Sequence, residues 1–231
     1  MSTLSETWRT FHGGADNAGT AMGWPTETLI RLFRGPYLAG ELPQSFKGMR
    51  VLDVGCGNGN NLVFLNSLGL ELAGTEVHQD ICTAAMAALA RGGITADIRP
   101  GFNTELPFES NSFDFLVSWN VVHYETSEAS MQAAIQEYAR VLKPGGRMFV
   151  STTGPDHKVM ADAEALGGHL YRLGAAADFR QGSTQFLFDH PNYIKHYFSA
   201  AFDDVQVGRT YDDFFGRGIL DWWLITAKAR K

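Results

Sequence analysis

The sequence predicts an α/β fold built on a parallel sheet. Between residues 50 and 152, short apolar runs of strand character alternate with helical patterns. Three alternate glycines follow the first run, and an acid ends the second. Strands and helices alternate in this way in parallel sheets, because each crossover between parallel strands needs a connecting segment, usually a helix. We therefore expect a ligand at the carboxyl ends of the strands.

The first predicted strand, residues 50–54, leads into Gly55, Gly57 and Gly59. Glycine permits positive φ and close backbone approach, and the helix that opens behind this loop points free N–H groups into it. An anionic ligand group is favoured there. The spacing is G-x-G-x-G, with Asn60 where the dinucleotide fingerprint expects its third glycine. The loop therefore indicates a cofactor site but counts against NAD.

The second predicted strand, residues 71–75, ends at Glu76, which lies about 20 residues beyond the first glycine. A carboxylate at this position can accept hydrogen bonds from both hydroxyls of a ribose. An ordinary surface glutamate after a strand is the alternative interpretation. Taken with the glycine loop, Glu76 favours an adenosine-bearing cofactor.

The remaining elements follow the same rhythm. Strands are predicted over 95–98, 113–118 and 146–152, and two more over 202–207 and 222–227. Apolar residues at helical spacing predict three intervening helices whose buried faces belong to the core. The first two faces end at Gly69 and Gly92, and the third begins at a Thr126 or Ser127 cap and ends at residues 143–146. These faces are Leu62, Leu65 and Leu68; Ile81, Ala85, Ala88 and Leu89; and Met131, Ala134, Ile135, Tyr138 and Leu142.

Residues 48–152 resemble the class I S-adenosylmethionine-dependent methyltransferases. Four segments in unbroken order carry the resemblance: residues 51–59, Glu76, residues 106–114 and residues 140–147. The resemblance implies a Rossmann-like, mostly parallel seven-stranded sheet flanked by helices and closed by a C-terminal hairpin. It also implies S-adenosylmethionine as methyl donor and S-adenosylhomocysteine as product. In this family the glycine loop packs against the methionine part of the cofactor, and the strand-two acid binds the ribose.

One position departs from the family pattern. Relatives often carry an aspartate four residues before Leu106, where it binds the adenine amino group, whereas this chain has Phe102. Phe102 could stack on the adenine ring or enter the core. Asn120 follows the fourth strand, where the family contacts the cofactor near its sulfonium; a polar loop residue without a ligand is the alternative. The predicted cofactor-binding set is Asp53, Gly55, Cys56, Gly57, Asn58, Gly59, Glu76, Val77, Phe102, Asn103 and Asn120.

His123 is the first candidate for a catalytic base, because an unperturbed histidine pKa near 6.5 suits proton removal at neutral pH. A structural histidine that is hydrogen-bonded beneath the loop is the alternative. Tyr124, His12 and His157 are reserve candidates, the last two only if their segments fold over the pocket.

We expect a single domain over residues 1–231, with the cofactor core at 48–152 and C-terminal strands at 201–231. The 1–47 segment is predicted to be an N-terminal helical lid, from the glycines of residues 11–19 and an apolar helical face of Leu29, Ile30 and Phe33. A helix packed permanently over the sheet is the alternative. The 153–200 segment is predicted to be a helical, substrate-side insertion between strands five and six. Its His157, Arg172 and Arg180 could bind an anionic substrate, although a solvated cap would look similar.

Composition narrows the class of partner. With 25 acidic and 19 basic side chains the net charge is −6, which argues against nonspecific nucleic-acid binding. The two cysteines have no metal-ligand spacing, so no metal is expected. No apolar stretch approaches the roughly 18 residues that span a bilayer, and no signal peptide is recognisable, so we expect a cytoplasmic location. A homodimer is left open.

The predicted function is methyl transfer from S-adenosylmethionine to an oxygen or nitrogen atom of a small-molecule acceptor. A sugar or polysaccharide-pathway metabolite is the favoured acceptor. A lipid-like or quinone acceptor, bound by aromatic residues near 186–198 and 211–223, is an alternative. A nonenzymatic cofactor-binding module is a second alternative, and a nicotinamide oxidoreductase is disfavoured by the glycine spacing.

Overall fold

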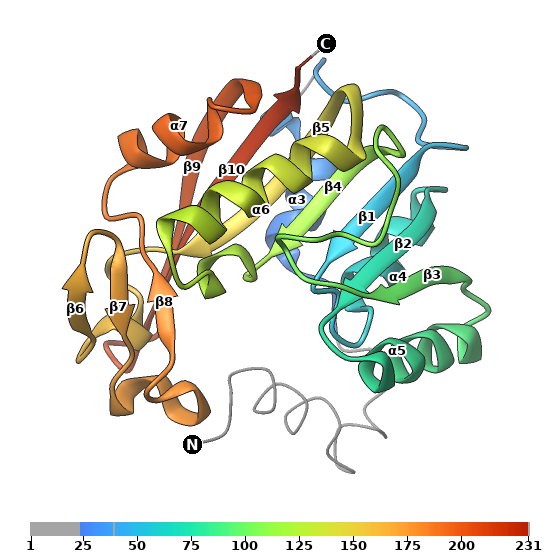
Figure 1. The fold of residues 1–231 in the computed structure, drawn as a ribbon. Coiled ribbons are helices and arrows are strands. Elements are labelled where there is room, and N and C mark those ends of the chain that lie inside the picture. The colour runs from blue at the N-terminus through green and yellow to red at the C-terminus, as the bar shows by residue number, and fades with distance from the viewer. Residues whose placement is uncertain (1–23, 39, 231) are drawn as a thin grey trace.

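The computed structural model describes residues 24–38 and 40–230. A seven-stranded sheet in the order β3-β2-β1-β4-β5-β10-β9 forms its centre (Figure 1). The first five strands are parallel, and β10 runs antiparallel to both β5 and β9. The predicted mostly parallel seven-stranded sheet is therefore confirmed. The strands are β1 (Arg50–Val54), β2 (Glu71–Glu76), β3 (Ala96–Pro100), β4 (Phe113–Trp119), β5 (Leu142–Thr153), β9 (Phe202–Asp213) and β10 (Ile219–Ala229).

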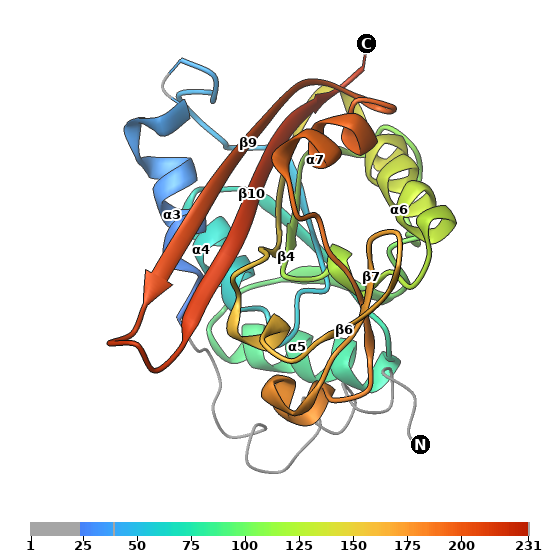
Figure 2. The same cartoon turned by 90° about the vertical axis from the view of Figure 1, so that its left-hand side faces the viewer.

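Helices cover both faces of the sheet. On one face lie α6 (Glu128–Val141) and α7 (Pro191–Phe198), and on the other lie α3 (Glu27–Arg34), α4 (Asn60–Ser67) and α5 (Gln79–Arg91). Figures 1 and 2 show these layers from two sides. Each face of the sheet therefore has its own hydrophobic core, as expected when a parallel sheet is buried on both sides.

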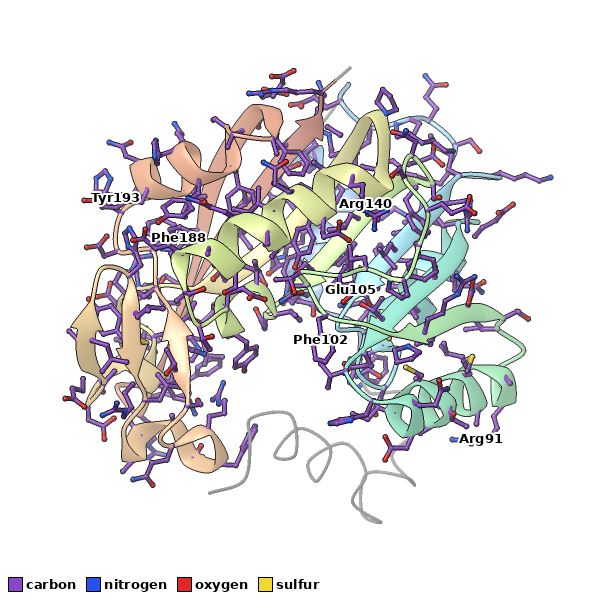
Figure 3. All side chains as sticks on the ribbon, in the orientation of Figure 1. Arg91, Phe102, Glu105, Arg140, Phe188 and Tyr193 are labelled. Atoms are coloured by element: carbon purple, nitrogen blue, oxygen red, sulfur yellow. The ribbon has the colours of Figure 1, made fainter. Side chains whose placement is uncertain are left out.

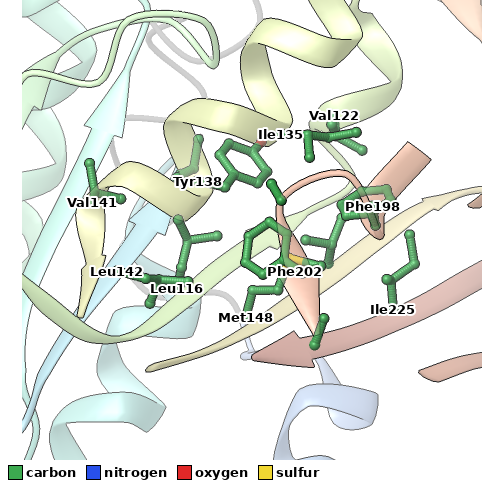
Figure 4. Packing of buried hydrophobic residues seen from close by; sticks show 14 of the residues in the cluster. Leu116, Val122, Ile135, Tyr138, Val141, Leu142, Met148, Phe198, Phe202 and Ile225 are labelled. Atoms are coloured by element: carbon green, nitrogen blue, oxygen red, sulfur yellow. The ribbon is translucent and has the colours of Figure 1, made fainter. Parts of the chain in front are cut away.

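The predicted helical stripes point into these cores. Ile135 and Tyr138 of α6 pack with Phe198 of α7 and Phe202 of β9, as Figure 4 shows. Ser127 caps α6 by accepting a hydrogen bond from the Ser130 backbone N–H. Helix α5 ends one residue before Gly92 as predicted, but the left-handed residue is the next one, Gly93, with φ of +71°.

The insertion is not mainly helical, so this part of the prediction is wrong. Residues 153–200 contain a three-stranded antiparallel sheet and two short 3₁₀ turns, with α7 as the one α-helix. Gly167 and Gly168, with φ of +104° and +56°, allow the tight reversal between the first two strands of this small sheet. Its elements are η3 (Lys158–Met160), β6 (Glu164–Gly167), β7 (Leu170–Arg172), η4 (Ala175–Arg180) and β8 (Thr184–Phe186).

The N-terminal segment carries the apolar helical face that the sequence predicts. In α3, Leu29 and Phe33 are buried. The ring of Phe33 packs against Phe115 of β4 and Phe149 of β5, with centroids 5.7 and 4.8 Å apart. A 3₁₀ turn, η1 (Pro36–Leu38), follows. The glycine-rich residues 11–19, on which the lid hypothesis rests, lie outside the described residues, so a mobile lid stays a prediction.

Candidate active site

A cavity of about 690 Å³ lies at the carboxyl ends of the central strands. This is the edge of a parallel sheet at which ligands bind. Three loops meet there: the glycine loop after β1, the loop after β3 and the loop after β4. Figure 3 shows Phe102 and Glu105 on the loop that follows β3. The cavity wall includes residues 54–58, 75–77, 101–104 and 119–121, together with Trp24, Thr26, Asn60, Asn61, Tyr124 and Glu125.

The glycine loop needs its glycines for two separate reasons. Gly55, Gly57 and Gly59 have φ of +67°, +54° and +81°, in the region that residues with a Cβ rarely adopt. A Cβ on Gly55 would also lie 2.5 Å from a methyl of Val121, on the neighbouring β4 loop. The loop can therefore lie close to the end of β4 only if position 55 has no side chain.

Glu76 is fixed on the cavity wall by the glycine loop itself. Its Oε1 accepts a hydrogen bond from the Gly57 N–H at 2.8 Å, and its Oε2 accepts one from the Val77 N–H at 3.1 Å. The residue is only 8% exposed. The carboxylate thus retains lone pairs for a diol ligand while two backbone groups hold its orientation. The sequence predicted this acid but not its link to Gly57.

Asp53 lies beneath the loop and is not part of the cavity wall. It is 1% exposed, and its Oδ2 has no hydrogen-bond partner among the described residues. Burial, with a smaller contribution from the negative charge of Glu76, raises the pKa of Asp53 to about 8. Asp53 is therefore protonated at neutral pH. The buried Cys56 next to it has a raised thiol pKa for the same main reason, loss of solvent.

Phe102 is 56% exposed and lines the cavity, so it does not enter the core. Beside it, Asn103 donates from Nδ2 to Glu125 and accepts at Oδ1 from the Tyr138 hydroxyl, both at 2.9 Å. The Tyr138 hydroxyl also lies 2.9 Å from the Ser118 hydroxyl. Sequence reasoning took Tyr138 as a core residue and did not select Glu125. Burial raises the pKa of Glu125. The only signal in the sequence that could have selected Glu125 as a cavity residue is its position just after the β4 loop.

Asn120 occupies the turn at the end of β4 with φ of +61°. Its backbone N–H donates to the Ser151 hydroxyl at 2.9 Å, and that hydroxyl donates back to the Asn120 side-chain oxygen. Asparagine is among the residues that tolerate this left-handed conformation. The neighbouring β5 therefore holds Asn120 in place on the cavity wall.

His123 lies behind the cavity wall rather than on it. It is 1% exposed, and neither ring nitrogen has a hydrogen-bond partner among the described residues. Burial, with smaller contributions from the nearby Arg180 and His157, lowers its pKa to about 3. Its ring centroid lies 4.4 Å from that of Tyr124, which does line the cavity. The alternative of a structural histidine hydrogen-bonded beneath the loop does not describe this environment.

The structure brings His157 and Arg180 toward His123 but leaves Arg172 apart. His157 is 3% exposed, and its ring lies 4.4 Å from that of Trp222, which in turn lies 6.2 Å from the His123 ring. Arg172 is exposed and pairs with Glu164 at 3.0 Å. His12 lies outside the described residues. Within residues 24–38 and 40–230, no group of three or more His, Cys, Asp or Glu side chains could hold a metal ion.

The fold and the cavity together define a Rossmann-like domain with a glycine loop and a strand-two acid. Residues 51–146 match the family model described as a methyltransferase domain. Over these residues, which make up less than half of the chain, the protein is therefore similar to methyltransferases, and a solved structure of the same fold from Methanosarcina mazei is described as an S-adenosylmethionine-dependent methyltransferase. The family resemblance of the sequence is confirmed.

Individual relatives agree with this assignment. The chain is 31% identical over 130 residues to a ubiquinone biosynthesis O-methyltransferase of Roseobacter denitrificans, covering 56% of this chain and 51% of that protein. It thus spans about half the length of this curated relative. A protein from Pyrococcus horikoshii has the same fold, with a TM-score of 0.69, 16% identity and coverage of 99% and 100% of the two chains.

A second solved structure shares the fold with the same TM-score. It is a phosphoethanolamine N-methyltransferase of Haemonchus contortus in complex with phosphomonomethylethanolamine and S-adenosylhomocysteine. The TM-score is 0.69 at 13% identity, over 100% of this chain and 61% of that one.

Among the helices of the described segments, none has the length and apolar character needed to cross a membrane.

Proposed function

We propose that this protein transfers a methyl group from S-adenosylmethionine to an oxygen or nitrogen atom of a small-molecule acceptor. The observation that carries the proposal is the Glu76 carboxylate, fixed by Gly57 on the wall of a cavity of about 690 Å³. An adenosine ribose placed against Glu76 would put the rest of the cofactor between the glycine loop and Asn120. Phe102 is exposed on the same wall and would stack on the adenine ring.

The chain's own residues would orient the acceptor and remove its proton. When bound, S-adenosylmethionine supplies a methyl group whose bond to sulfur breaks, with the electron pair left on sulfur, as the acceptor atom forms the new bond. Asn120 and Tyr124 line the cavity beside the β4 loop, where they would hold the acceptor in line and exclude water. For a hydroxyl acceptor, neutral His123 would take the proton on a ring nitrogen.

The acceptor class remains part of the proposal. The relatives described above give no support to a sugar or polysaccharide metabolite, whereas the ubiquinone biosynthesis O-methyltransferase supports the quinone-type alternative. The aromatic residues suggested for that alternative do not line the cavity. Phe186, Phe188 and Phe198 are fully buried in the core, and Phe214 and Phe215 are exposed at the β9–β10 turn.

The first test is a choice among cofactors. We expect calorimetric titration to show saturable binding of S-adenosylmethionine and S-adenosylhomocysteine and no comparable binding of NADH, because the loop lacks the third fingerprint glycine. A preference for NADH, or no binding of either sulfur cofactor, would overturn the proposal. Tight binding without turnover on any acceptor in a broad screen would favour the nonenzymatic module instead.

A second test concerns the pH dependence of turnover. Burial lowers the pKa of His123 to about 3, so the ring is neutral throughout the neutral range. We expect kcat/KM to show no acidic limb between about pH 5 and pH 8, in contrast to the limb near 6.5 of an unperturbed histidine. The measurement is release of S-adenosylhomocysteine as a function of pH, with the acceptor identified by the screen.

The matched variant for this test is His123→Gln. Loss of a general base typically lowers the rate by 10²- to 10⁴-fold, so we expect kcat to fall by at least about 100-fold. Near-normal kcat in His123→Gln across pH 6 to 9 would remove the base role. An acidic limb of kcat/KM near pH 6.5 in the unmodified protein would contradict the buried, neutral state of His123.

A cytoplasmic location and a homodimer stay predictions.

A further inference from the structure

Five buried polar side chains near the end of β5 and on the neighbouring β8 have side-chain atoms without hydrogen-bond partners among the described residues: His123, Thr152, Thr153, His157 and Gln185. Three of them lie around Trp222: His123, with both ring nitrogens unpartnered, Thr153, with its hydroxyl, and His157, with Nε2. All are at most 3% exposed. Buried polar groups in folded proteins almost always have a partner, and an exception calls for an explanation such as an absent ligand. No group in the cofactor contacts proposed above accounts for these three.

The three side chains belong to one region of the fold. The Trp222 ring contacts His157, with centroids 4.4 Å apart, and lies 6.2 Å from the His123 ring. Thr153 is the direct partner of Trp222 in the β5–β10 pairing. The region therefore lies where β5, β10 and the turn after β4 meet, and the insertion begins there (Figure 1). Tyr124, in contact with His123, separates it from the cofactor cavity.

Most of the unpartnered groups in this region are hydrogen-bond donors. His157 Nδ1 accepts from the Val159 backbone N–H at 3.2 Å, so the proton of the neutral ring is on Nε2. That Nε2–H and the Thr153 hydroxyl are donors without acceptors. Neutral His123 contributes one donor nitrogen and one acceptor nitrogen. A ligand that satisfies this set must supply several acceptor atoms.

Arg180 adds a positive charge to the same region. Its guanidinium lowers the pKa of both His123 and His157 and hydrogen-bonds the Tyr124 side chain. Over the described residues, Arg180 has no ion pair with a carboxylate, whereas Arg172 pairs with Glu164. The buried carboxylate near His157, Asp221, is already held by Arg209. Within residues 24–38 and 40–230, the charge of Arg180 therefore has no counterion.

The loop that carries His157 is rigidly held. Asp221 accepts from the Asp156 backbone N–H at 2.9 Å, and the Asp221 carbonyl accepts from the Gly154 N–H at 2.8 Å. Arg209 bridges Asp221 and Asp156. A side chain on Gly154 would overlap the Asp221 carboxylate. His157 is thus positioned before any ligand arrives, as a binding site requires.

We propose that Thr153, His157 and Arg180 form a subsite for an oxyanion, a phosphate or a carboxylate, on the methyl acceptor. This inference rests on the proposed function, because it places the acceptor next to the cofactor cavity. The oxyanion supplies acceptor atoms for the Nε2–H of His157 and the Thr153 hydroxyl and a counterion for Arg180. A neutral quinone would leave these donors and the Arg180 charge unpaired.

The test uses inorganic phosphate and acetate as probes and the ring resonances of the histidines as the readout. We expect saturable shifts of the His123 and His157 signals on titration of the full chain, assigned through His157→Gln. Stronger shifts with phosphate would indicate a phosphorylated acceptor, and stronger shifts with acetate a carboxylate. Loss of a charge-assisted hydrogen bond should make Arg180→Gln bind the preferred probe at least about tenfold more weakly.

Arg172→Gln is the matched control, because it removes an insertion arginine that is already paired, and its probe affinity should be unchanged. Thr153→Val is a second variant that weakens binding without altering charge, in case Arg180→Gln does not fold. Absence of saturable shifts with either probe up to about 50 mM, or equal affinity in Arg180→Gln and Arg172→Gln, would overturn the subsite.

The failure of this inference and of the proposed function can be told apart. The probe titrations are run with and without S-adenosylhomocysteine, whose binding is measured by calorimetry on the same samples. A protein that binds phosphate at His157 but no sulfur cofactor would overturn the proposed function and retain the oxyanion site. A protein that binds the sulfur cofactor but neither probe would overturn the oxyanion site and retain the proposed function.

Discussion

Glu76→Ala should abolish detectable binding of S-adenosylhomocysteine at micromolar protein concentration. The carboxylate would accept hydrogen bonds from both ribose hydroxyls, and bonds to a charged group are worth about 1.5 to 3 kcal/mol each. Losing both should raise Kd by at least about 100-fold. The variant also leaves the Gly57 N–H without its acceptor, which loosens the glycine loop. Calorimetric titration of the purified variant measures the effect.

The matched control is Glu71→Ala. Glu71 begins the same strand, but its side chain is 65% exposed and its only ion pair in the described residues is a 4.0 Å contact with Arg50. Exposed pairs contribute about 0 to 1 kcal/mol, so stability and cofactor affinity should both stay close to those of the unmodified protein. Equal cofactor affinity in the two variants would show that Glu76 does not bind the ribose.

Gly55→Ala should have the second large effect, on stability and cofactor binding together. The new Cβ would occupy a left-handed backbone, at a cost of about 1 to 2 kcal/mol. It would also press on Val121 at 2.5 Å, and overpacking costs about 1 to 3 kcal/mol more. We therefore expect a loss of about 2 to 5 kcal/mol in the free energy of unfolding, measured by urea denaturation.

Gly145→Ala separates the two contributions. Gly145 has a similar backbone, with φ of +79°, but a Cβ there would meet nothing within 4 Å. This variant should lose only the backbone cost of about 1 to 2 kcal/mol and bind S-adenosylhomocysteine normally. Cofactor affinity in Gly55→Ala should fall at least about tenfold, because Val121 and the glycine loop both line the cavity. Equal losses in the two variants would mean that the contact with Val121 is unimportant.

Much of the cofactor half was accessible from the sequence because its signals are local. The strand at 50–54 was placed at its observed bounds, since a buried strand followed by glycines leaves few other conformations. The positive φ values of Gly55, Gly57 and Gly59 follow from residue type and spacing alone. The role of Glu76 needed only the end of a strand and the rule that parallel strands end at one edge.

The acceptor side depended on contacts between residues far apart in the chain. The insertion contains glycines and aromatic residues that suit either a helical cap or a small sheet, and packing selected the sheet. The sequence does not distinguish Arg172 from Arg180. In the part of the chain that the structure describes, Arg172 pairs with Glu164, whereas Arg180 lies near His123 without a counterion. Asn103, Glu125 and Tyr138 join only because the loop after β3 lies against both the residues just before α6 and the C-terminal half of that helix.

By itself, then, the sequence determined the order of the strands along the chain, the glycine loop and the acid at the end of the second strand. The tertiary structure alone decided the environment of each of these side chains: His123 is buried and neutral, Phe102 is exposed on the cavity wall, and Arg180 has no counterion among the described residues. The physical reason is that backbone conformation is set mainly by neighbours in sequence. Burial and charge, which govern pKa and hydrogen bonding, are set by neighbours in space.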